Sequence, residues 1–254
     1  MTTVVIPLAA RSDYFPLAQY PHPLPLTEVM RLPMIQYVIE NLRRLEATVQ
    51  FVFIVLKDDC SRFHLDRSLK LLADGAQVVI LENMTQGALC SCLMAIEHID
   101  HAQPLIIANG DQYLDIDVAT LLPEFVADAA DAACLYFRAV TPRWSYVKVE
   151  GQQVVEAAEK KPISRHAVAG FYYFRSGALF LDAASRSILQ RTTEDGRYFI
   201  APVLNQLIID NRRVYAREIS NDAYFSFYTP QRIEEFEQRH GQRVAALVDG
   251  KGGS

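Results

Sequence analysis

The stretch Pro104-Leu-Ile-Ile-Ala-Asn-Gly-Asp-Gln-Tyr-Leu-Asp-Ile-Asp117 decides how the rest of the chain is interpreted. Its apolar run, residues 105–108, predicts a strand buried on both faces. The run stops at Asn109-Gly110-Asp111, and ligands in open α/β sheets bind just beyond the carboxyl ends of the strands. Asp111 is therefore placed where a carboxylate can hold Mg²⁺ against substrate phosphates. Asn, Gly and Asp are also common turn residues, so a purely structural turn is an equal alternative.

Strands and helices alternate in the first half of the chain. Besides residues 105–108, the sequence predicts apolar strands at residues 3–8, 50–56 and 77–81. The segments between them have helical periodicity and predict helices at residues 33–46, 61–73 and 85–99. This alternation indicates a parallel sheet with helices on both faces.

The second half changes character. It predicts strands at residues 132–139, 145–149, 154–158, 168–174 and 214–218, with helices at 118–128, 177–191, 199–211 and 230–239. The short turns between several of these strands indicate antiparallel or mixed pairing. The predicted fold class is α/β, with a mixed, mostly parallel sheet. We expect a single domain over residues 1–248 and a flexible tail over residues 249–254.

The composition is that of an ordinary globular protein, with 50% hydrophobic and 22% charged residues. The formal net charge of -5 leaves no broad basic surface for nucleic acid. No apolar run is long enough to span a membrane, and the N-terminus does not resemble a signal peptide. The four cysteines lack metal-ligand spacing and are predicted to be free thiols. We therefore expect a cytoplasmic protein without membrane insertion, and the sequence leaves a homo-oligomer open.

Four segments resemble, in the same order, the motifs of sugar-phosphate nucleotidylyltransferases. They are Val5-Ile-Pro-Leu-Ala-Ala-Arg-Ser-Asp-Tyr-Phe15, Pro25-Leu-Thr-Glu-Val29 with Pro33-Met-Ile35, Asn109-Gly-Asp111, and Glu156-Ala-Ala-Glu-Lys-Lys-Pro162 with Ala167-Val-Ala-Gly-Phe-Tyr-Tyr-Phe174. The likeness extends from about Val4 to Glu237. The segments Pro142-Arg-Trp-Ser-Tyr146 and Glu159-Lys-Lys-Pro-Ile-Ser164 most resemble a branch associated with bacterial capsule and surface-polysaccharide synthesis.

The resemblance implies a glycosyltransferase-A-like fold, Mg²⁺ as cofactor, and an enzyme that joins a nucleoside triphosphate to a sugar 1-phosphate or another phosphorylated small molecule, releasing pyrophosphate. It assigns catalysis to Arg11 and Asp111, with Arg11 on the triphosphate and Asp111 on the metal. The nucleotide-binding residues that it implies are Leu8, Ala9, Ala10, Gln86, Gly87, Asn109 and Gly110. The substrate-binding residues that it implies are Trp144, Glu159, Lys160, Lys161 and Gly170.

The chain also departs from the family pattern. The family's first loop carries glycines where this chain has Ala10 and Ser12. The family's phosphate-contacting lysine is replaced by Leu24. Its second metal aspartate falls on Ser226, and Asp222, four residues earlier, is the candidate substitute as a metal ligand.

Two functional alternatives therefore stay open. A nucleotide-sugar-dependent glycosyltransferase would use Asp115-Ile-Asp117 as its metal motif, although Asp117 is also well placed to cap a helix. A degenerate homologue would keep the pocket and bind nucleotide without turnover.

Several site residues have structural alternatives. Gly87 is suited either to close approach of the nucleotide base or to opening and packing a helix. The charges at residues 159–161 form either a substrate site or a solvated cluster. Trp144 either stacks on a ligand or belongs to the core.

Overall fold

The structure, a computed structural model, describes residues 1–12, 14–16 and 19–249. Its main strands are β1 (Thr2–Pro7), β4 (Val49–Leu56), β5 (Gln77–Leu81), β6 (Leu105–Ala108), β8 (Ala132–Arg138), β9 (Ser145–Glu150), β10 (Gln153–Glu159), β11 (His166–Phe174) and β12 (Val214–Glu218). Within the described residues they form one sheet in the order β5-β4-β1-β6-β11-β8-β12-β10-β9.

The sheet is mixed, but most of its strands share one direction. The pairs β5–β4, β4–β1, β1–β6 and β8–β12 are parallel. Strand β11 runs antiparallel to β6 and β8, and β10 runs antiparallel to β12 and β9. Of the nine strands that the structure describes in this sheet, β11 and β10 oppose the others, which leaves seven in one direction. The predicted fold class is confirmed.

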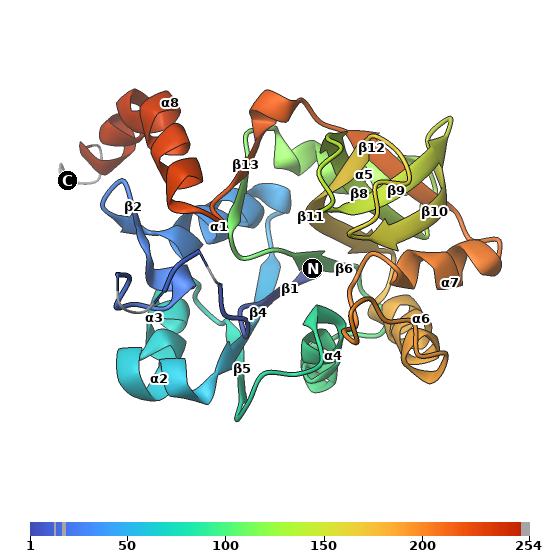
Figure 1. Cartoon of the computed structure of the whole chain (residues 1–254), viewed down its shortest axis with the longest axis horizontal. Helices are drawn as coiled ribbons and strands as arrows, with labels where there is room; N and C mark the ends of the chain where they lie inside the picture. Colours follow the sequence, from blue (N-terminus) through green and yellow to red (C-terminus); the bar gives the residue numbers. More distant parts are fainter. Residues whose placement is uncertain (13, 17–18, 250–254) are drawn as a thin grey trace.

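Helices cover both faces of the sheet (Figure 1). They are α1 (Met34–Leu42), α2 (Lys57–Phe63), α3 (Leu65–Leu72), α4 (Ala88–Leu93), α5 (Leu121–Ala127), α6 (Gly177–Leu189), α7 (Val203–Ile209) and α8 (Pro230–Asp249). Successive residues of β1 point to opposite faces. Val4 and Ile6 join the core under α1, α3 and α5, whereas Val5 joins the core under α4, α6 and α7. Both faces of β1 are thus buried, which explains its uninterrupted apolar sequence.

Short elements complete the chain around the sheet. The small strands are β2 (Glu28–Val29), β3 (Leu32–Pro33), β7 (Gln112–Leu114) and β13 (Tyr224–Ser226). The 3-10 helices are η1 (Leu24–Leu26), η2 (Arg43–Leu45), η3 (Ile96–His98), η4 (Val118–Thr120) and η5 (Asn221–Ala223). Pairing of β13 with β7 brings the C-terminal segment beside the stretch that follows β6. Helix α8 then packs through Phe236 against Tyr37 of α1.

Several predicted helices differ from those observed. The helix expected at residues 61–73 is divided by His64, whose φ of 54° ends α2 and precedes α3. The helix expected at residues 85–99 begins only after Gly87, whose φ of 118° is not helical. The last helix continues beyond residue 239 and includes Asp249, which was expected in the tail. The rest of that tail, residues 250–254, lies outside the described residues.

No helix in the described part of the chain has both the length and the apolarity that are needed to cross a membrane.

Candidate active site

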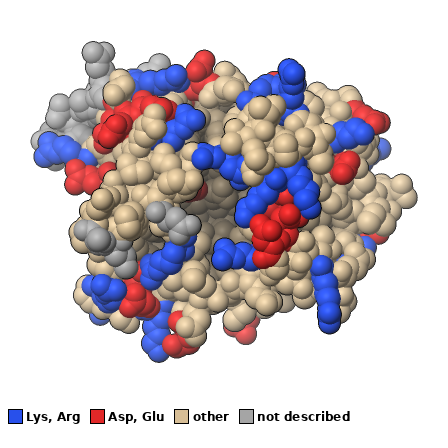
Figure 2. All heavy atoms as spheres, viewed as in Figure 1, with Lys and Arg blue, Asp and Glu red and all other residues tan. Residues whose placement is uncertain are grey.

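A cleft opens where β1 and β6 end, and it consists of two adjoining cavities. Cavity A, of about 380 Å³, is lined by Pro7, Ala9, Ala10, Arg11, Met84, Thr85, Gly87, Ala88, Ser91, Arg197 and Phe199. Cavity B, of about 240 Å³, is lined by Ala88, Asn109, Arg143, Trp144, Ser145, Glu159, Val168, Gly170, Tyr172, Phe199 and Ile200. Ala88 and Phe199 belong to both walls, so the cavities meet there. Figure 2 shows a hollow near the middle of this face with Lys and Arg side chains around it.

The two arginines that line cavity A differ in their ion pairing. Arg11 donates to both carboxylate oxygens of Asp59, at 2.6 and 2.9 Å, and to Asp58 at 3.3 Å. Asp59 is buried, so this guanidinium compensates a carboxylate that water cannot reach. Arg197, in contrast, makes no ion pair with any residue that the structure describes. No motif singled out Arg197, because its position depends on the fold of the segment before α7.

Gly87 has the packing role predicted for it and also lines cavity A. A Cβ on Gly87 would collide with the backbone of Tyr198, so close packing requires glycine here. The backbone carbonyl of Gln86 accepts a hydrogen bond from the amide of Tyr198 at 2.7 Å, which holds the two segments together. Gln86 itself is not among the residues that line cavity A, and its backbone bond to Tyr198 holds the neighbouring Gly87 in place.

Leu8 and Gly110 form a packed support beneath the cleft. The amide of Leu8 donates to the carbonyl of Ile54 at 2.8 Å, which extends the pairing of β1 with β4. The Leu8 side chain lies directly over Gly110, where a Cβ would have no room. These two residues place the backbone that follows β1 against the backbone that follows β6.

Glu159 is the buried carboxylate of cavity B. It accepts a hydrogen bond from the hydroxyl of Ser145, and the hydroxyl of Tyr172 lies 3.5 Å from the same Ser145 oxygen. Burial raises the pKa of Glu159, while the bond from Ser145 and the charge of Lys160 act in the opposite direction. The side chain is therefore held in place and faces the cavity as a hydrogen-bond acceptor.

The two lysines after Glu159 point to different partners. Lys160 lies 5.3 Å from the ring centroid of Phe199 and 3.7 Å from a carboxylate oxygen of Asp195. Because Phe199 is a shared wall, Lys160 lies beside the junction of the two cavities. Lys161 pairs with Glu194 at 2.5 Å and does not line either cavity.

Gly170 forms the back of cavity B. Its φ is 57°, and the register between β11 and β8 shifts between Val168 and Tyr172. The Gly170 carbonyl accepts hydrogen bonds from the backbone amide of Asn109 at 2.9 Å and from the Gln112 side chain at 3.0 Å. A Cβ on Gly170 would displace the side chains of Asn109 and Gln112. This glycine therefore fixes the turn that carries Asn109.

Asp111 is the last residue of the turn formed by residues 109–111. Its backbone carbonyl accepts a hydrogen bond from the amide of Phe227 at 2.7 Å, so β13 lies alongside. Desolvation raises the pKa of its carboxyl group from 3.8 to about 6. The Asp111 charge is in turn one cause of the raised pKa of Tyr224, after burial of that phenol. Among the described residues no ion pair compensates Asp111.

The structure places Ser226, and not Asp222, next to this carboxylate. Ser226 pairs with Gln112, the neighbour of Asp111, across β13 and β7. Asp222 lies in η5, where its exposed carboxylate pairs with Arg239 at 3.1 Å. No group of three or more His, Cys, Asp or Glu side chains that could hold a metal occurs in the described ranges. A cation here would thus be held by Asp111 together with substrate oxygens.

The other acidic motif has structural roles. The side chain of Asp117 accepts a hydrogen bond from the amide of Ala119 at 3.3 Å and caps η4, as predicted. Asp115 lies 3.5 Å from the His240 ring of α8. Leu24, at the position of the family lysine, packs against the cluster that includes Phe15 and Met34.

Trp144 lies between cavity B and cavity C, of about 260 Å³, which also contains Asp222 and Arg239. It packs against the core at the ring of Phe137, 5.4 Å away between centroids. Arg143, which precedes it, lines cavity B and stacks on Tyr228 at 4.1 Å from the ring centroid. The sequence reasoning did not single out Arg143, whose role depends on Tyr228, 85 positions later.

The sequence profile of the nucleotidyl transferase family matches residues 15–221. No curated protein gives a significant match by sequence. Among solved structures, the nucleoside-diphosphate-sugar pyrophosphorylase from Vibrio cholerae RC9 is 22% identical, with a TM-score of 0.81 over 92% of this chain and 99% of that chain. The UDP-glucose pyrophosphorylase from Acinetobacter baumannii is 14% identical, with a TM-score of 0.72 over 98% of each chain.

Proposed function

The chain belongs to the nucleotidyl transferase family, and from that premise we propose that it joins a nucleoside triphosphate to a phosphorylated small molecule and releases pyrophosphate. The observation that carries this proposal is the pair of cavities meeting at Ala88 and Phe199, beside the turn that presents Asp111. Within this proposal the acceptor is either a sugar 1-phosphate or another phosphorylated small molecule, and a role in surface-polysaccharide synthesis is its finer form. The two structural neighbours, both pyrophosphorylases of nucleotide sugars by name, support a sugar as the acceptor.

The nucleotide occupies cavity A in this proposal. Ala9 and Ala10 offer backbone to the phosphates, and Gly87 offers a wall without a side chain to the base. Arg197 supplies the cation that faces the phosphates, because Arg11 is already engaged by Asp58 and Asp59. Arg11 then acts by holding the loop after β1 against α2.

The acceptor occupies cavity B. Glu159 accepts hydrogen bonds from its hydroxyl groups, and burial makes such bonds stronger than they would be in water. Lys160 and Arg143 provide positive charge for its phosphate. Gly170 and Asn109 shape the end of the cavity nearest to Asp111.

The reaction is an in-line displacement at phosphorus. An oxygen of the acceptor phosphate attacks the α-phosphorus, the bond from the α-phosphorus to the bridging oxygen breaks, and pyrophosphate leaves with that electron pair. The protein contributes mainly by positioning the two substrates and by stabilising charge. The uncompensated carboxylate of Asp111 fits a bound Mg²⁺, which would neutralise phosphate charge when present. Asp222 does not fit this role because it pairs with Arg239 in another cavity.

Pyrophosphate release tests the proposal. ATP, GTP, CTP, UTP and dTTP are each combined with glucose 1-phosphate, glycerol 3-phosphate or O-phospho-L-serine in the presence of Mg²⁺. We expect one combination to turn over at about 1–1000 per second and to give a diphosphate-linked product by mass spectrometry. Silence across the panel, with nucleotide still raising the melting temperature, would instead support the degenerate binding protein. Transfer of sugar from a nucleotide sugar would support the glycosyltransferase.

A further inference from the structure

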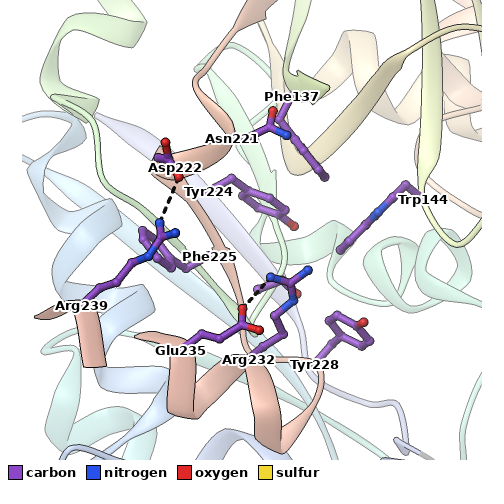
Figure 3. A pocket seen from close by; sticks show the side chains of 11 residues that line it. Phe137, Trp144, Asn221, Asp222, Tyr224, Phe225, Tyr228, Arg232, Glu235 and Arg239 are labelled. Carbon is purple, nitrogen blue, oxygen red and sulfur yellow. Dashed lines mark hydrogen bonds and ion pairs between the residues drawn. The ribbon is translucent and has the colours of Figure 1, made fainter. Parts of the chain in front are cut away.

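Cavity C lies behind Trp144, on the side away from cavity B. Its walls come from η5, β13 and the first turns of α8, together with Phe137 and Trp144 (Figure 3). Trp144 is a wall of both cavities B and C. Cavities B and C therefore adjoin at this indole, as cavities A and B adjoin at Ala88 and Phe199.

One wall of cavity C is a set of contacting aromatic rings. The ring of Tyr224 lies 4.5 Å from Phe137 and 5.9 Å from Trp144, and Tyr228 lies 5.9 Å from Trp144, between centroids. Contacting rings of this kind are held rigidly and present faces that attract cations. The protein's own Arg143 illustrates this, since its guanidinium sits 4.1 Å from the Tyr228 centroid.

The opposite wall carries two ion pairs of balanced charge. Arg232 pairs with Glu235 at 2.6 Å, and Arg239 pairs with Asp222 at 3.1 Å. All four side chains are more than 40% exposed, and ion pairs in such settings contribute little to stability. They are consequently free to exchange partners with a ligand. Figure 3 shows Arg232 directed into the same space as the rings of Trp144, Tyr224 and Tyr228.

This charge balance determines which ligand fits. A ligand with a carboxylate alone would take Arg232 and leave Glu235 without a partner, whereas an ammonium alone would do the reverse. A group with both charges pairs with both residues at once. Since the charged atoms of Arg232 and Glu235 are 2.6 Å apart, the two ligand charges must also be adjacent.

We propose that cavity C binds the end of the acceptor opposite its phosphate, and that this end carries an ammonium and a carboxylate side by side, as an α-amino acid does. The inference rests on the proposed function in taking cavity B as the acceptor site. The rings hold the ammonium and the carbon chain, while Arg232 and Glu235 orient the two charges. The acceptor is then a phosphorylated amino-acid-like molecule and not a neutral sugar phosphate.

Trp144 makes a direct test feasible because it is the single tryptophan of the chain. Its fluorescence is titrated with L-alanine, propionate and ethylamine, which carry both charges, the carboxylate only and the ammonium only. No nucleotide is present, so the outcome does not depend on turnover in the pyrophosphate assay. We expect L-alanine to bind at least about tenfold more tightly than either analogue, which corresponds to about 1.4 kcal/mol.

Two variants of cavity C show whether the probes bind there. Arg232→Gln should weaken L-alanine and propionate about tenfold and leave ethylamine unchanged, whereas Glu235→Gln should weaken L-alanine and ethylamine. Arg62→Gln is the matched control, because Arg62 is an equally exposed helical arginine paired with Asp58. The inference would be overturned if the three probes bound equally, if propionate bound more tightly than L-alanine, or if L-alanine gave no response. Binding of L-alanine at wild-type affinity by both variants would overturn it as well. Circular dichroism confirms that the variants are folded.

Discussion

At the scale of single residues, Asp111 carries a charge that its surroundings oppose. Desolvation raises the pKa of its carboxyl group to about 6, and no ion pair among the described residues offsets this. At neutral pH the group is still ionised, so a bound cation would relieve an unfavourable charge. The same desolvation that favours metal binding thus makes Asp111 costly to the metal-free protein.

Asp111→Asn tests this account through stability. Because the folded-state pKa is raised, the stability that this carboxyl group contributes is fully present below the unfolded pKa of 3.8 and is lost as pH rises through about 6. Without Mg²⁺, we expect the variant to exceed wild type at pH 8 by on the order of 1–2 kcal/mol, allowing for partial solvent exposure. The difference should close toward pH 4. Thermal unfolding of both proteins between pH 4 and pH 8 measures this difference in stability. A variant less stable than wild type at pH 8 would show that the fold stabilises the carboxylate.

Arg11 is predicted to act as a structural clamp. Arg11→Ala would leave the buried Asp59 without its partner, and we expect a loss of about 1–3 kcal/mol because one partner is buried and the other partly exposed. The Arg11→Ala, Asp59→Asn double variant should recover part of this loss. Titration with the nucleoside triphosphate should show a larger effect for Arg197→Ala than for Arg11→Ala. Unchanged melting with abolished nucleotide binding in Arg11→Ala would assign Arg11 to the phosphates instead.

At the scale of elements, strands were more predictable than helices. The strands expected at residues 77–81, 105–108 and 214–218 match β5, β6 and β12. For β6 the reason is burial on both faces, which leaves an unbroken apolar run with sharp ends. Helix ends depended on single backbone conformations, such as that of His64, which periodicity does not encode. The three-residue strands β7 and β13 were not predicted because they are too short to have a pattern, yet they bring Ser226 beside Asp111.

The residues of the site also divide into those that the sequence predicted and those that only the fold shows. Motif resemblance pointed to Gly87, Glu159 and Gly170, and the fold places all three on the cleft. Arg143 lies in the segment Pro142–Tyr146 but was given no role there, and Arg197 belongs to no motif; both line the cleft only through tertiary packing. The pairing of Arg11 with Asp59, 48 positions away, likewise required the fold. Sequence therefore located the strand ends that carry the site, while its charge balance required the structure.

The junction at α4 gives a prediction for this element. Ala88→Leu adds a side chain where cavities A and B meet, and misplacing the substrates should lower pyrophosphate release at least about a hundredfold. Alanine and leucine have similar helix propensities, so melting should change little. Ala127→Leu, on the exposed side of α5, is the matched control and should keep wild-type activity. Wild-type turnover in Ala88→Leu would mean that the two cavities are not occupied together.

At the scale of the whole molecule, the charge of the cleft differs from that of the chain. The net charge is -5, yet Arg143, Lys160 and Arg197 all lie at the cleft. Concentrating cations there attracts phosphorylated ligands although the chain as a whole is acidic. The sheet supports this arrangement, since β1 and β6 supply the turns of cavity A and Asp111, while β9 to β11 supply cavity B.

The central claim is that the acceptor phosphate attacks the α-phosphorus of the nucleotide. The most direct measurement uses the substrate pair active in the panel, with ¹⁸O in the non-bridging oxygens of the acceptor phosphate, followed by mass spectrometry of the products. The account predicts that all of the label stays in the diphosphate-linked product and that pyrophosphate is unlabelled. Label in inorganic phosphate, or an unlabelled nucleotide product, would contradict nucleotidyl transfer.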